Sequence, residues 1–65
     1  MDFGKMLLEF RAKHNLNQKQ MAEIIGVSFV MVSQYENEKF KPTTRNEIIF
    51  KRKMEKWEER KYENV

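Results

Sequence analysis

Gly26 stands between two short segments whose apolar residues recur at helical spacing. Before it, Met21 and Ile25 fall on one face of a helix, and after it Val32 and Tyr35 do the same. A residue without a side chain adopts a positive φ at no steric cost, so the chain can turn sharply at this position. The pattern predicts two short helices joined by a tight turn, which projects the second helix from a compact support.

The chain has only 65 residues, with no cysteine and a single histidine. A chain of this length buries too little surface for two cores, so we expect one domain over residues 1–65. This composition excludes disulfides, zinc sites built on cysteine and multi-histidine metal sites. Stability therefore has to come from packing, and we expect no cofactor.

The first segment carries one apolar stripe, formed by Phe3, Met6, Leu7 and Phe10. Asp2 is placed to complement the positive end of this helix. We expect the helix to end near Asn15, which tolerates the left-handed conformation, and Leu16 to fill the core behind it.

Capping residues mark the starts of the next two helices. Asn17 is a suitable N-cap for the helix that Gly26 ends, and Ser28 is one for the helix that follows. The second of these is expected to run to about Glu36, so the helix-turn-helix covers about residues 18–36.

A longer helix is predicted at the C-terminal end of the chain. It opens after Pro42, where Thr44 and Glu47 match a capping box, and no breaker follows it, so it spans about residues 44–62. Strand-like alternation is absent from the sequence. The expected fold class is therefore all-α, a compact domain of four helices.

Six short groups of residues stand at fixed offsets along the chain: Phe10-Arg11, Leu16-Asn17-Gln18, Met21-Ala22, Ile25-Gly26-Val27-Ser28, Val32-Ser33 and Tyr35-Glu36. This pattern resembles the helix-turn-helix of phage repressor and Cro proteins, the lambda-repressor-like or xenobiotic-response-element family. The resemblance covers about Met6 to Met54, and Pro42 stands where the family has a proline after a basic loop. It implies a lambda-repressor-like fold that places the second motif helix in the major groove of double-stranded DNA.

Four residues of that helix are the expected base contacts: Phe29, Val30, Ser33 and Gln34. Gln34 suits bidentate contacts to adenine, Ser33 suits a base or a phosphate, and Phe29 and Val30 suit thymine methyl groups. Two alternatives stay open. The alternative for Phe29 and Val30 is that they extend the core or a dimer contact. The alternative for Ser33 and Gln34 is that they form a solvated surface.

The resemblance also implies contacts to the DNA backbone. Gln18 would bind a phosphate at the positive end of its helix, helped by Asn17 or Lys19, and its alternative role is plain capping. Lys39 and Lys41 follow the second motif helix, where the family grips flanking phosphates, and their alternative role is a pair of solvated charges.

Arg11 and Glu36 occupy positions where the family commonly has a structural ion pair that orients the second motif helix. The family usually has glycine where Glu38 stands, so we expect Asn37 to take the left-handed conformation at this exit. His14 has no catalytic partner in the sequence and is expected at the surface.

The C-terminal helix carries an apolar stripe at i, i+4 and i+7, formed by Phe50, Met54 and Trp57. We expect this stripe to be a dimer contact that places two motif helices on successive major-groove faces of a palindromic site. The alternative is that Trp57 folds back on the first helix. Residues 51–53 are basic and form either a solvated face or a second phosphate contact.

The net charge is +3 and the pI near 9.3, which agrees with a polyanionic partner without requiring one. We expect a small transcriptional repressor of phage or mobile-element type, acting as a homodimer on an operator. The alternatives are an antitoxin-like autoregulator and a protein-protein interaction module. The sequence lacks a nucleophile and base pair and a phosphate-binding glycine loop, so no enzyme and no small-molecule substrate are expected. The start of the chain does not resemble a signal peptide, and a cytoplasmic protein without membrane contact is expected.

Overall fold

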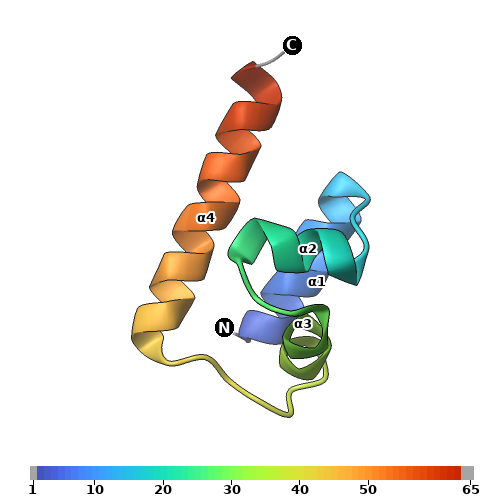
Figure 1. Cartoon of the computed structure of the whole chain (residues 1–65), viewed down its shortest axis with the longest axis vertical. Coiled ribbons are helices and arrows are strands. Elements are labelled where there is room, and N and C mark those ends of the chain that lie inside the picture. Colours follow the sequence, from blue (N-terminus) through green and yellow to red (C-terminus); the bar gives the residue numbers. More distant parts are fainter. Residues whose placement is uncertain (1, 64–65) are drawn as a thin grey trace.

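The computed structural model describes residues 2–63, which form four helices in the order α1 (Phe3–His14), α2 (Gln18–Ile25), α3 (Phe29–Glu36) and α4 (Thr44–Glu63). Helix α4 runs beside the other three helices, and a loop at one end of the molecule connects it to α3 (Figure 1). The all-α fold with one long C-terminal helix is confirmed. None of these helices is long and apolar enough to cross a membrane.

Local hydrogen bonds set the first three helix starts: Asn17 and Ser28 are the N-caps that the sequence predicts, and Asp2 caps α1. The carboxylate of Asp2 accepts from the Gly4 N–H at 3.1 Å, and Ser28 Oγ accepts from the Met31 N–H at 3.3 Å. Asn17 and Gln20 form a full capping box, in which each side chain accepts from the other residue's N–H at 2.7 and 2.9 Å. These bonds satisfy backbone donors that a helix start leaves unpaired.

Helix α4 starts at Thr44, as predicted, but the expected capping residue is wrong by one position. Thr43 Oγ1 accepts from the Asn46 N–H at 3.2 Å, and the Thr43 carbonyl accepts from the Glu47 N–H at 2.8 Å. Thr43 is therefore the N-cap, and Thr44 is the first helical residue.

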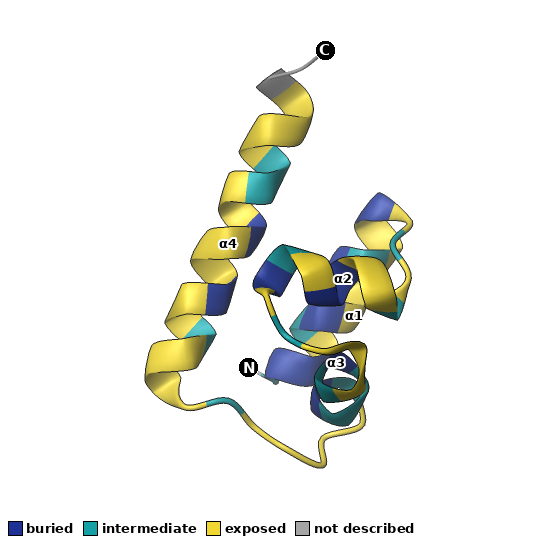
Figure 2. Ribbon diagram, in the orientation of Figure 1, coloured by how far each residue is buried: buried dark blue, intermediate teal, exposed yellow. Residues whose placement is uncertain are grey.

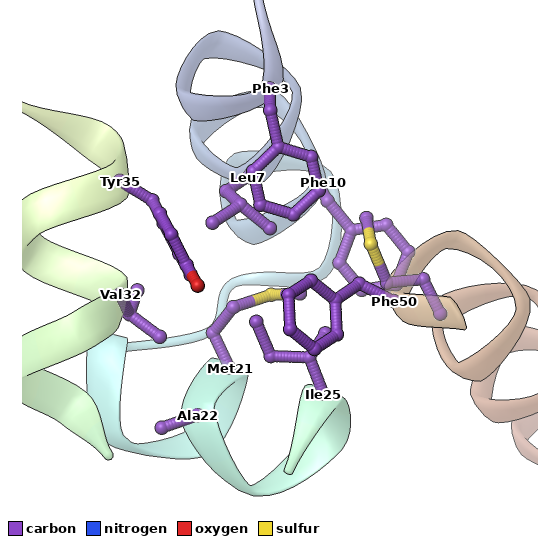
Figure 3. Close-up of a cluster of buried hydrophobic side chains, with 10 residues drawn as sticks. Phe3, Leu7, Phe10, Met21, Ala22, Ile25, Val32, Tyr35 and Phe50 are labelled. Atoms are coloured by element: carbon purple, nitrogen blue, oxygen red, sulfur yellow. The ribbon is translucent and has the colours of Figure 1, made fainter. Parts of the chain in front are cut away.

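All four helices contribute to one hydrophobic core, which Figure 3 shows in close-up. The buried members are Phe3, Leu7, Phe10, Met21, Ala22, Ile25, Val32, Tyr35, Phe50 and Met54. Leu16 packs against the edge of this core, as expected.

Helices α1 and α3 approach each other closely at Gly4. A Cβ atom at this position would collide with the carbonyl oxygen of Tyr35 and would lie 3.2 Å from the Cα atom of Glu36. The absence of a side chain therefore allows the backbones of α1 and α3 to touch, which positions α3 against its support.

Candidate nucleic-acid interface

Helix α3 is anchored on one side and open on the other. Val32 is completely buried and Tyr35 is 6% exposed, with its ring edge-on to that of Phe3 at 5.5 Å. On the other side, Phe29 is 56% exposed and Val30 is 50% exposed. Figure 2 shows exposed and half-buried positions along the outer side of α3, away from the core. The helix is therefore held rigidly while an apolar surface faces solvent.

The two polar residues expected at the DNA lie next to that apolar pair. Ser33 and Gln34 are half-buried and sit one turn after Phe29 and Val30 along α3. The Ser33 hydroxyl accepts a hydrogen bond from Asn37 Nδ2 at 3.3 Å, which leaves its own hydrogen available. Helix α3 thus exposes two apolar side chains in its first turn and has two half-buried polar ones in the next turn.

An ion pair ties α3 to α1. Arg11 donates from Nε and Nη2 to the two carboxylate oxygens of Glu36 at 2.7 and 2.8 Å, and from Nη1 to the Leu16 carbonyl at 3.2 Å. The Glu36 side chain is only 4% exposed. This bidentate geometry fixes the orientation of both groups, as the sequence suggested.

A third member of this network was missed by sequence reasoning. Gln18 Nε2 donates to Glu36 Oε1 at 3.0 Å, so the first residue of α2 is joined to the last residue of α3. The Gln18 side chain is therefore engaged within the protein, whereas the sequence suggested a phosphate contact. The sequence contains both residues at the spacing of the motif, but this spacing does not indicate whether the Gln18 amide donates to Glu36 or to a phosphate.

The start of α2 still offers donors to an anion. The Oδ1 atom of Asn17 is occupied by the capping box, but the N–H groups of Gln18 and Lys19 have no acceptor among residues 2–63. They lie at the positive end of the helix dipole, and the Lys19 side chain is exposed beside them. This helix end can receive a phosphate through its backbone.

The loop after α3 carries the two remaining basic candidates, Lys39 and Lys41, which are both exposed. The expectation that Asn37 is left-handed is wrong: its φ is −88°, and Glu38 takes the left-handed conformation with φ of 61°. The Glu38 N–H donates to the Tyr35 carbonyl at 3.1 Å, and the Lys39 N–H to the Gln34 carbonyl at 2.9 Å. These two bonds form a Schellman motif, which requires its positive φ at the residue where the family has glycine.

Comparison with family models matches residues 7–46, more than half of the chain, to a family described as helix-turn-helix, of lambda-repressor/Cro type. The chain belongs to the lambda-repressor/Cro-like helix-turn-helix family. This is a family of DNA-binding transcription regulators, and the matched region contains α2, α3 and the Arg11–Glu36 pair. No curated protein and no solved structure matches the chain.

The expectation that Phe50, Met54 and Trp57 form a dimer contact is not met, because these residues pack within the protein itself. Phe50 and Met54 are 7% and 5% exposed because they complete the core beneath α4. Trp57 packs against the rings of Phe10 at 5.7 Å and His14 at 4.9 Å. The stripe therefore covers the protein's own α1, which is the alternative stated for Trp57.

The expectation that His14 is at the surface is also wrong. Its side chain is 1% exposed, Nε2 lies 2.6 Å from Glu58 Oε2, and Nδ1 lies 3.3 Å from Lys61 Nζ. The hydrogen bond from His14, and to a lesser degree that from Lys13, lowers the pKa of Glu58 below its ordinary value, although partial burial opposes this. These contacts attach the C-terminal part of α4 to the end of α1.

Proposed function

We propose that this protein binds a specific sequence of double-stranded DNA by inserting α3 into the major groove. The observation that carries the proposal is the contrast between the two sides of α3. One side is fixed by the buried Val32 and Tyr35 and by the hydrogen bonds of Glu36 to its partners on α1 and α2. On the other side, Phe29 and Val30 expose at least half of their surface. A rigid helix with an unburied apolar tip is the geometry that groove insertion needs.

The surroundings of α3 support the same function. The free N–H groups at the start of α2 and the exposed lysines of the loop after α3 are suited to phosphates on either side of a groove. Such contacts set the register of the protein on the duplex but carry no sequence information.

We further propose that the protein acts as a small repressor that blocks a promoter, of the kind that phages and mobile elements use. Two copies on an inverted repeat would place two α3 helices one helical turn apart. Because Phe50 and Met54 are buried, contact between copies has to use other residues, and Ile48 offers an apolar side chain of α4 that is 50% exposed.

The test begins with selection of bound duplexes from a random DNA pool. The recovered duplex and a scrambled control are then titrated with protein at two salt concentrations. The expected result is an inverted repeat bound far more tightly than the control, with an affinity that falls steeply as salt rises.

Matched variants assign the roles of individual residues. Gln34→Ala is expected to relax discrimination at one base position, with a loss of about 1–3 kcal/mol on the selected site. Lys41→Ala is expected to weaken selected and scrambled DNA by the same factor. Equal losses for both variants on both duplexes would contradict these roles, and no enrichment in the selection would favour a protein-binding module instead.

A further inference from the structure

Helix α3 presents no usable charge to a DNA groove. Its sequence from Phe29 to Glu36 contains no lysine or arginine, and Glu36 is its one charged residue. That carboxylate accepts three hydrogen bonds, from Arg11 and Gln18, and its side chain is 4% exposed. Glu36 is therefore withdrawn from any contact outside the protein.

This lack of charge limits which bases α3 can read. Guanine is most often recognised by the paired donors of arginine or by lysine, and the cytosine amino group by a carboxylate. Helix α3 has no free group of either kind. The commonest specific contact to a G·C pair is thus unavailable to this helix.

What α3 does present is apolar. Phe29 and Val30 lie in its first turn and expose 56% and 50% of their surface. Among the base edges of the major groove, the C5-methyl group of thymine is the apolar feature that such side chains can cover. Gln34 complements them, because its amide matches the donor and acceptor pair of adenine, the partner of thymine.

We infer that α3 reads thymine methyl groups, so that each half-site contains a run of A·T pairs recognised through methyl contacts to Phe29 and Val30. This inference rests on the proposed DNA-binding function and specifies how that function selects its sequence. In this arrangement, α2 and the loop after α3 contact phosphates and set the register of the protein on the duplex. The uncharged face of α3 provides the sequence preference.

The experiment removes methyl groups without changing base pairing. The duplex recovered from the random pool is resynthesised with deoxyuridine in place of one thymidine at a time across each half-site. Loss of one buried methyl group is expected to weaken binding about fourfold, from about 0.8 kcal/mol per buried carbon. Substitution at thymidines outside the half-sites is expected to leave the affinity unchanged.

Protein variants connect each methyl group to its side chain. Phe29→Ala and Val30→Ala are expected to bind more weakly to the thymidine duplex and to lose discrimination at the deoxyuridine position that each side chain contacts. Both side chains are largely exposed, so these variants are expected to fold, which circular dichroism checks. Leu8→Ala, which removes an exposed apolar side chain of α1, serves as the matched control and is expected to keep the full thymidine preference.

The outcomes separate this inference from the proposed function. A specific site whose deoxyuridine versions bind as tightly as the thymidine duplex would overturn methyl reading and leave DNA binding intact. A selected half-site dominated by G·C pairs would overturn it as well. Failure to recover any site would instead refute the proposed DNA-binding function, and the inference with it.

Discussion

Replacing Glu38 by glycine is expected to make the protein more stable, although the substitution removes a side chain. Glu38 has a φ of 61°, in the left-handed region, where a Cβ atom approaches the backbone too closely. The Schellman motif that ends α3 holds it there through the Tyr35 and Gln34 carbonyls. The structure thus retains a strained residue at a position that glycine fits.

The size of the effect follows from two opposing terms. A residue other than glycine costs about 1–2 kcal/mol in the left-handed region. Glycine loses more backbone freedom on folding, by about 0.5–1 kcal/mol. The free energy of unfolding is therefore expected to rise by about 0.5–1 kcal/mol, which for a domain of this size corresponds to a Tm increase of about 2–8 °C.

Thermal and urea unfolding followed by circular dichroism measure this change. Glu38→Ala is the matched control, because it removes the carboxylate but keeps the Cβ atom and the strain, and little gain is expected. Asn37→Gly is a second control, since Asn37 has an ordinary φ of −88°. Glycine there adds chain entropy and removes the hydrogen bond to Ser33 Oγ, so this variant is expected to be less stable than the natural chain. If Glu38→Gly is no more stable than Glu38→Ala, the strain argument is refuted.

Three further predictions concern the contacts that hold the helices together. Gly4→Ala is expected to destabilise the protein by about 1–3 kcal/mol, because α1 and α3 must move apart, and a Tm equal to that of the natural chain would contradict this close approach. Arg11→Met is expected to cost about 2–3 kcal/mol, because the buried Glu36 carboxylate loses its cationic partner and keeps only the Gln18 amide, and the double variant with Glu36→Leu is expected to recover part of that loss in urea titrations. Because the pKa of Glu58 is lowered in the folded state, its contribution is complete above the unfolded pKa of about 4.3 and is lost as the pH falls through the lower folded value. The stability difference between the natural chain and Glu58→Gln is therefore expected to be constant above about pH 5 and to shrink as the pH falls below it, and a difference that stays constant in acid would contradict the assigned role.

The sequence by itself determined the local features of this protein. The N-caps Asn17 and Ser28 act within three residues, and Gly26 has a φ of 78° at the turn, so these boundaries depend on short-range hydrogen bonds and sterics. The Arg11–Glu36 pair was also accessible, but only through the family resemblance, because 25 residues separate the partners.

The tertiary structure decided which helix faces and side chains contact each other. The stripe of Phe50, Met54 and Trp57 shows that one face of α4 is covered. The same periodicity is expected whether that face packs against a second copy of the chain or against the protein's own α1. His14 carried no apolar signal and became buried because α4 brings Trp57 and Glu58 against it. Sequence patterns give the face that a helix buries, whereas the identity of its neighbour depends on how the whole chain packs.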